Sequence, residues 1–178
     1  MTVGAAQREM REVFSNGSIG QLVAGGIWLA SAALATWGTK PQAIVVLVAG
    51  GAFIYPLTQL ILRLRGRRFK ASSDNPLTPL ALQVAFIVPL TLPIAGGAAL
   101  HDINWFYPAV TVIVGAHYLP FASLYGLRTY AALGAILIAS GLGFALFAPH
   151  AFAWAGWFTG AVLVACSAWL ASLNPHPE

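Results

Sequence analysis

The stretch TYAALGAILIASGLGFALFAPHAFAWAGWFTGAVLVACSAWLASL, residues 129–173, contains no Asp, Glu, Lys or Arg. A helix needs roughly 20 apolar residues to cross a hydrocarbon core of about 30 Å, so this stretch is long enough to cross twice. The same bias runs through the whole chain, which is 58% apolar and 8% charged, against about 25% charged residues in ordinary soluble proteins. The sequence therefore predicts an all-α polytopic membrane protein.

Six segments are long and apolar enough to span a bilayer. They are Ile19–Trp37, Ala43–Leu62, Leu77–Leu100, Tyr107–Tyr125, Thr129–Phe147 and Ala151–Leu173. The connections between them are short, and short connections force successive helices to lie antiparallel and side by side. We expect residues 1–178 to form one transmembrane bundle, with residues 1–18 as a cytoplasmic segment before the first span.

The distribution of Lys and Arg predicts the orientation. With the N-terminus in the cytoplasm, the outer side carries only Lys40, and cytoplasmic segments carry more Lys and Arg than exported ones. The inner side then collects the other basic residues: Arg8, Arg11, Arg63, Arg65, Arg67, Arg68, Lys70 and Arg128. We expect both termini inside and a multi-pass location in the cell inner membrane. The topology accounts for the net charge of +4, so nucleic acid is not an expected partner.

The N-terminal region has two alternatives of its own. Residues 5–14 have the periodicity of a short amphipathic helix on the cytoplasmic interface, although a frayed tail is the other possibility. The first span could also be a cleavable signal peptide ending near residues 33–35. Glu9 and Glu12 dilute the basic region, and the apolar run continues to Trp37, which favours a true span.

Residues 51–60 (GAFIYPLTQL) resemble residues 115–124 (GAHYLPFASL). Both segments run from outside to inside in the predicted topology and end at a basic loop. Repeated two-helix hairpins related by an axis along the membrane normal would produce such a match, and so would chance in Gly/Ala-rich sequence. Prolines interrupt the same region, and Pro89 and Pro93 predict a kink in the third span, either as a gate or as static architecture.

Gly156 and Gly160 form a GxxxG pattern in the sixth span. Small residues at this spacing let two helix backbones approach closely. Packing within the chain is the preferred interpretation, and a homo-oligomer through Gly156 and Gly160 is the alternative.

His117 is the titratable residue nearest the middle of a predicted span. A polar group at that depth needs hydrogen-bond partners, and an intramembrane ionisable residue is a functional candidate by default. His117 starts a stripe at positions i, i+4, i+7 and i+11 that reaches Arg128 at the inner surface. The predicted ligand-binding residues, chosen by depth, are His117, Tyr118, Tyr55, Gln59, Gln83 and Arg128. The competing interpretation is a structural histidine that joins helices.

The sequence gives little evidence for catalysis or for metal binding. No motif of a soluble active site is present, and an acid, a base and a nucleophile do not converge, so we do not expect an enzyme or a cofactor. His101 and Asp102 supply at most two metal ligands, and a helix-capping turn explains them better than a metal site. The lone Cys166 is interpreted as a packing residue. The basic run Arg63, Arg65, Arg67, Arg68 and Lys70 is topogenic, with anionic lipid as its candidate partner.

Three stretches carry a resemblance to known sequences: residues 8–14 (REMREVF), residues 74–77 (DNPL) and residues 117–128 (HYLPFASLYGLR). Together they resemble an uncharacterised family of small bacterial multi-spanning inner-membrane proteins, a domain of unknown function. The resemblance implies a bacterial inner membrane and carries over no functional residue.

Two functions follow from these observations. The first is a small-solute or ion transporter or channel with a site between the second, third and fourth spans, centred on His117. The second is a non-transporting membrane protein that binds lipid or a partner protein. A polar cavity reaching His117 would favour the first, and a solid core with a lipid-facing groove would favour the second.

Overall fold

The computed structural model describes residues 1–66 and 71–173, and within them it contains six helices long and apolar enough to cross a membrane. This confirms the predicted all-α, six-span fold class. The helices begin and end within three residues of the predicted spans: α2 Ser18–Trp37, α3 Lys40–Leu64, α4 Thr78–His101, α5 Phe106–Tyr125, α6 Arg128–Phe147 and α7 Phe152–Ser172.

A short amphipathic helix, α1 (Val3–Phe14), precedes the first span, so the N-terminal segment is helical rather than frayed. Its apolar face buries Ala6, Met10 and Val13. A turn of 3₁₀ helix, η1 (Ser15–Gly17), separates α1 from α2, and all three of its residues have positive φ. A regular helix cannot continue through left-handed backbone, so the chain changes direction here. A second 3₁₀ turn, η2 (Ile103–Trp105), links α4 to α5.

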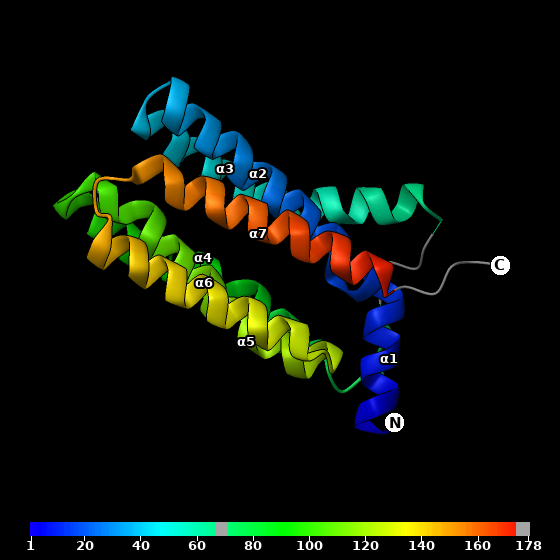
Figure 1. Ribbon diagram of the computed structural model, residues 1–178. Coiled ribbons are helices and arrows are strands. Elements are labelled where there is room, and N and C mark those ends of the chain that lie inside the picture. The colour runs from blue at the N-terminus through cyan, green and yellow to red at the C-terminus, as the bar shows by residue number, and fades with distance from the viewer. Residues whose placement is uncertain (67–70, 174–178) are drawn as a thin grey trace.

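The six spans form two layers (Figure 1). In the first layer, α2 packs against both α3 and α7, and in the second layer, α5 packs against both α4 and α6. Contacts between the layers are less extensive and run mainly from α5 and α6 to α7. Short connections therefore give antiparallel neighbours within hairpins, but the last helix returns to pack on the first.

Glycines bring the two central helix pairs into close contact. A Cβ added at Gly25 of α2 would lie 3.2 Å from the Gly160 carbonyl oxygen of α7, and one added at Gly134 of α6 would lie 2.8 Å from the Gly115 carbonyl oxygen of α5. Helices in a membrane gain no hydrophobic free energy by associating, because lipid tails are as apolar as their side chains. Close van der Waals contact between backbones at these glycines stabilises the pairs instead. Gly156 and Gly160 thus face α2 of the same chain, as the preferred interpretation expected.

The outer helices α3 and α4 are the least buried spans. In the most apolar 18-residue stretch of each helix, only 6% of the residues of α3 and 11% of those of α4 are buried, against 39% for the stretches that contain α5 and α7. Most of their exposed side chains are apolar, as expected of helices that face lipid, with Gln83 of α4 as an exception. The two similar segments consequently have different surroundings: Gly51 of α3 has open space around it, whereas Gly115 of α5 contacts α6.

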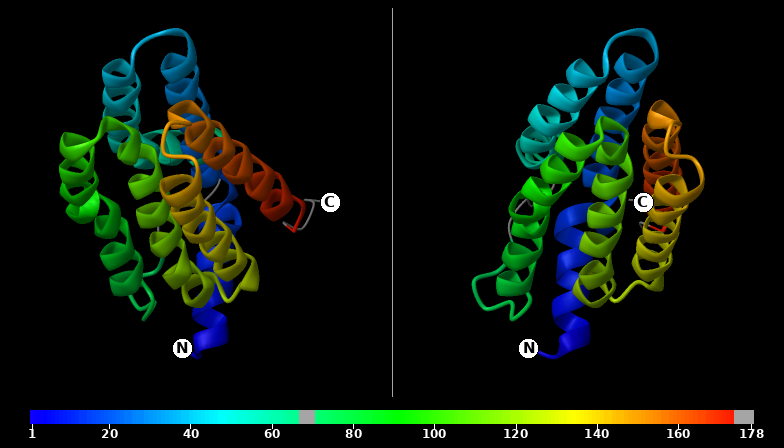
Figure 2. Two further views of the ribbon diagram at one scale, coloured as in Figure 1. Left: turned by 60° about the vertical axis from the view of Figure 1, so that its left-hand side comes forward. Right: turned by 90° about the vertical axis from the view of Figure 1, so that its left-hand side faces the viewer.

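The two ends of the bundle differ in charge. One end, which we call the inner end, contains α1, the connection before α4 and the end of α7. Two hydrogen bonds bring these segments together: Glu9 accepts one from the Ser72 amide, and Asn16 donates one to the Leu170 carbonyl. Lys40 lies at the opposite, outer end, where it donates to Asn104. Figure 2 shows the N-terminus and the α2–α3 connection at opposite ends of the bundle.

Candidate functional site

His117 lies on α5 and faces α4. Its ring interacts with the backbone of Val84, and its centroid is 5.5 Å from that of Tyr118 and 5.0 Å from that of Phe121. The side chain is half-buried, and its Nδ1 atom is buried without a hydrogen-bond partner among the described residues. The histidine is therefore held between two helices of the second layer while one ring nitrogen stays unsatisfied.

The predicted stripe below His117 is filled by aromatic rings. Tyr118, Phe121, Tyr125 and Tyr130 stack on one another, with interplanar angles of 25° to 27° for the contacts that involve Tyr130. Tyr118, Tyr125 and Tyr130 are buried, and Tyr130 donates a 2.5 Å hydrogen bond to the Asn16 carbonyl of η1. In this structure the stripe is thus a packed aromatic cluster between the His117 level and the inner surface.

The other predicted site residues are not gathered around His117. Tyr55 is 69% exposed on α3, and Gln83 and Arg128 are also exposed. Gln59 is half-buried, and its Oε1 atom is buried without a hydrogen-bond partner in the described part of the chain. Of the six candidates, the structure brings His117 and Tyr118 together.

A residue that sequence reasoning passed over, Gln21 of α2, lies inside the protein. Its side chain is 3% exposed, and neither amide atom has a hydrogen-bond partner among residues 1–66 and 71–173. The Cys166 thiol of α7 lies beside the amide, and the Tyr118 phenol interacts electrostatically with the same thiol. The sequence analysis did not single out Gln21, although a glutamine inside the predicted span Ile19–Trp37 was a signal that could have found it.

Gln21, Tyr118 and Cys166, which we call the interlayer site, lie where the two layers meet. His117 adjoins the site on the α4 side of α5, with its ring centroid 5.5 Å from that of Tyr118. The register of the helices supports this placement, because α5 and α7 run parallel and Thr111 shares a 3.0 Å hydrogen bond with Thr159. Tyr118 and Cys166 each follow those threonines by seven residues, or two helical turns. The site therefore combines side chains from α2 and α7 of one layer with a side chain from α5 of the other.

Hydrogen bonds between the layers lie on both sides of the interlayer site. Towards the outer end, buried Ser31 of α2 donates to the Ala43 carbonyl and is hydrogen-bonded to the Tyr107 hydroxyl of α5. Towards the inner end, Tyr130 binds η1 as described above. The site is thus enclosed between an outer and an inner group of polar contacts.

α1 covers the inner end of the bundle through polar contacts to three segments. Gln7 donates a 2.7 Å hydrogen bond to the Ser123 carbonyl, and Arg11 donates to the Tyr125 carbonyl at the end of α5. Glu9 accepts a 2.7 Å hydrogen bond from the Asn75 amide. The three stretches that carry the family resemblance, residues 8–14, 74–77 and 117–128, therefore meet at this end.

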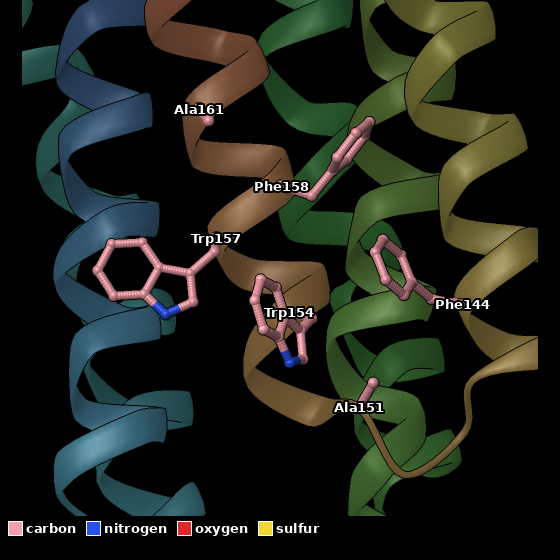
Figure 3. A pocket seen from close by; sticks show the side chains of 6 residues that line it. All are labelled: Phe144, Ala151, Trp154, Trp157, Phe158 and Ala161. Carbon is pink, nitrogen blue, oxygen red and sulfur yellow. The ribbon is translucent and has the colours of Figure 1, made fainter.

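A shallow groove of about 380 Å³ opens on the outer half of the protein between α6 and α7 (Figure 3). Aromatic and small apolar side chains line it: Phe144, Ala151, Trp154, Trp157, Phe158 and Ala161. Trp154 is 70% exposed, and Trp157 donates a 3.0 Å hydrogen bond to Thr36. The groove is apolar and distant from the interlayer site, so it suits a lipid chain better than a polar solute.

The remaining candidates are placed as follows. Asp102 accepts a 2.9 Å hydrogen bond from the Asn104 amide and so caps η2, and the described residues contain no group of three or more potential metal ligands. Arg63 and Arg65 lie at the inner end of α3, whereas Arg67, Arg68 and Lys70 lie outside the described residues. Anionic lipid at this run and a homo-oligomer through Gly156 and Gly160 stay predictions.

Comparison with known proteins places the chain in a family. Residues 3–173 match the Family of unknown function (DUF7010), so the chain belongs to that family, in agreement with the resemblance seen in the sequence. No curated protein and no solved structure shows a significant match. The family carries no assigned activity.

Proposed function

We propose that this integral membrane protein is a small-solute transporter or channel whose binding site is the interlayer site. The observation that carries the proposal is the Gln21 amide, which is buried to 3% exposure and has no hydrogen-bond partner among the described residues beyond a weak interaction with the Cys166 thiol. Leaving a buried polar group unsatisfied costs about 1–3 kcal/mol. A polar occupant that bonds to the amide would recover part of that free energy.

The two-layer architecture supports transport. Glycine-mediated backbone contacts hold each layer together, whereas the layers meet through aromatic rings and a few hydrogen bonds. Transporters commonly bind substrate near the middle of the membrane and expose it alternately by rocking one bundle against another. A site between two such layers fits that mechanism, provided that the layers part. In the conformation described, packed rings fill the space beside His117 and the groove faces outward, which is the pattern expected of lipid binding, so a solute could enter only after the layers separate.

We place the protein in a bacterial inner membrane with both termini in the cytoplasm, and we propose binding and transport rather than catalysis. The support for the orientation is the gathering of Arg8, Arg11, Arg63 and Arg128 at the inner end and of Lys40 at the outer end. The interlayer site offers amide, phenol and thiol groups, which can bind a solute by hydrogen bonds.

The native Cys166 provides the test, because it is the chain's only cysteine and lies at the site. The protein is reconstituted into liposomes and treated with a small, uncharged, water-soluble methanethiosulfonate reagent, which reacts with the thiolate that forms only where water reaches a thiol. If water reaches the site, Cys166 is modified. The control is Cys166→Ser with Leu90→Cys, since Leu90 of α4 is 74% exposed on a span that faces lipid. No modification of Cys166, or modification of the Leu90→Cys control at the same rate, would contradict the proposal.

Lipid binding is the second candidate function, and the groove between α6 and α7 favours it. Indole rings are common at membrane interfaces, where one part of the ring is apolar and the other polar. Replacing Ala161 with Trp would fill the groove and should reduce the lipid retained by the purified protein in native mass spectrometry. Leu142→Trp on the exposed face of α6 is the control. Equal lipid retention by both variants would argue against a specific lipid site.

A further inference from the structure

We infer that the interlayer site takes an uncharged solute that both donates and accepts hydrogen bonds. The inference rests on the proposed function and specifies its substrate class. It follows from the charges that the described spans lack, from the polar atoms that the site offers, and from the packing of the aromatic rings beside it.

The described spans carry charged side chains only at their ends. Lys40 is the first residue of α3, Arg63 lies in its last turn, and Arg128 is the first residue of α6. An ion at the interlayer site would therefore be far from a side chain of opposite charge. Moving an unpaired ion into an apolar medium costs far more than moving a neutral polar group, so the site favours a neutral occupant.

The polar atoms of the site include donors and acceptors. The Gln21 amide has an oxygen that accepts and a nitrogen that donates, and both are unpartnered. Next to the site, on the α4 side of α5, the buried Nδ1 atom of His117 has no hydrogen-bond partner among the described residues, and the ring interacts with the Val84 backbone. An amide N–H inside a helix is used by the helix, so the Val84 carbonyl is the group left for the imidazole N–H, and Nδ1 is then an acceptor. An occupant such as an amide or a polyol matches this combination.

Organic cations could bind without a carboxylate if aromatic faces were open. In this cluster, however, the Tyr118, Phe121 and Tyr125 rings each stack on the Tyr130 ring, with centroids 5.3 to 6.0 Å apart. A cation needs an open ring face within about 6 Å, and one face of each of these three rings is taken up by the contact with Tyr130. The packing therefore disfavours a cation and leaves hydrogen bonding as the basis of recognition.

Three molecules of nearly equal shape separate the alternatives: acetamide is neutral, acetate is an anion and acetamidinium is a cation. The reconstituted protein is treated with the uncharged thiol reagent in the presence of each, and the rate of Cys166 modification is measured. Acetamide should slow it roughly twofold at a concentration equal to its Kd, because half of the sites are then occupied. Acetate and acetamidinium should leave the rate unchanged.

Variants at Gln21 test whether acetamide protects Cys166 by binding at the interlayer site. Gln21→Leu should abolish the protection by acetamide, and Gln21→Glu should transfer it to acetamidinium, because a carboxylate now faces the solute. Gln83→Leu, on the exposed face of α4, is the matched control and should keep the protection by acetamide. If Gln21→Leu does not fold, Gln21→Met, which keeps the length of the side chain, serves in its place.

The outcomes separate the inference from the proposed function. If Cys166 reacts but acetate or acetamidinium protects it better than acetamide, or no probe protects it, the substrate class is wrong and the transport proposal stands. If Cys166 is not modified in the native protein, the transport proposal fails and the inference fails with it. Protection by acetamide that survives in Gln21→Leu also overturns the inference.

Discussion

At the scale of single residues, the burial of Gln21 is the feature that a contribution to stability does not explain. Polar side chains in the interior of the bundle are in most cases hydrogen-bonded: Ser31 binds Tyr107, Thr111 binds Thr159, and Ser167 donates to the Ser18 carbonyl. Gln21 is as buried as these residues, yet both of its amide atoms lack partners among the described residues. Strained or unsatisfied groups concentrate at functional sites, where stability is given up for function.

Replacing Gln21 with leucine should therefore stabilise the protein. Leucine has a similar volume and no polar atoms, so the substitution removes an unsatisfied amide and should raise the free energy of unfolding by about 1 kcal/mol. Thermal unfolding of the detergent-purified protein measures the effect. Gln83→Leu changes an exposed side chain and should shift the transition little. A lower transition temperature for Gln21→Leu would show that the glutamine supports the fold.

At the scale of the helices, the contacts of each glycine decide what it contributes. Gly134 and Gly143 both lie inside α6, but only Gly134 is in a close contact: an added Cβ would lie 2.7 Å from a Leu119 methyl and 2.8 Å from the Gly115 carbonyl oxygen. A Cβ at Gly143 would meet nothing within 4 Å. The first glycine thus permits the α5–α6 contact, whereas the second has no packing role that the structure shows.

Alanine substitutions at these two positions should have opposite effects. Gly134→Ala should separate α5 from α6 and destabilise the protein by about 1–3 kcal/mol, as overpacking does elsewhere. Gly143→Ala should be neutral or stabilising by up to about 1 kcal/mol, because glycine is the poorer helix former. Thermal unfolding of the two variants side by side measures the difference. Equal transition temperatures would contradict the close α5–α6 contact.

At the scale of the whole molecule, the two ends and the two layers organise the protein. Hydrogen bonds from Glu9 and Asn16 bring the N-terminal segment, the connection before α4 and the end of α7 to the inner end. The bond between Lys40 and Asn104 joins two connections at the outer end. These contacts lead to separate predictions for topology and for the layers.

The topology predicts opposite accessibility at the two ends. In a Cys166→Ser background, a cysteine at position 72 should react with an impermeant reagent only from the cytoplasmic side, and one at position 104 only from the outer side. The reason is the positive-inside distribution together with the placement of Ser72 beside Glu9 and of Asn104 beside Lys40. Labelling of intact cells and inverted vesicles measures the accessibility. A reversed pattern would invert the orientation, and labelling from the same side at both positions would contradict the span count between them.

The layers should need to move apart for Cys166 to become accessible. The hydroxyl oxygens of Thr111 and Thr159 are 3.0 Å apart across the layers, so cysteines at both positions are placed to form a disulfide. Oxidation of this pair should lower the rate of Cys166 modification, and reduction before labelling should restore the rate.

A cross-link within one layer is the matched control. A Cβ at Gly156 would lie 3.1 Å from the Ala32 Cβ, so Ala32→Cys with Gly156→Cys joins α2 to α7 and leaves the layers free. If the cross-link between layers leaves the rate of Cys166 modification unchanged, the site opens without relative movement of the layers.

The sequence by itself determined how the chain crosses the membrane. Apolar length and the positions of the charges predicted six helices, each with ends within three residues of those observed, because the thickness of the bilayer sets a physical length that composition must match. The same reasoning placed Asp102 in a capping turn and assigned a packing role to Gly156 and Gly160, since local spacing controls both.

Only the tertiary structure decided which side chains meet. Spacing along a helix gives the depth of a residue, and Tyr55 and Gln83 were chosen by depth, but their direction around the helix axis depends on neighbouring helices, and both face outward. Gln21 and Cys166 are distant in sequence and near opposite ends of the chain. They come together because α7 returns to pack on α2, and a long-range helix pairing of this kind leaves no local periodic signal in the sequence.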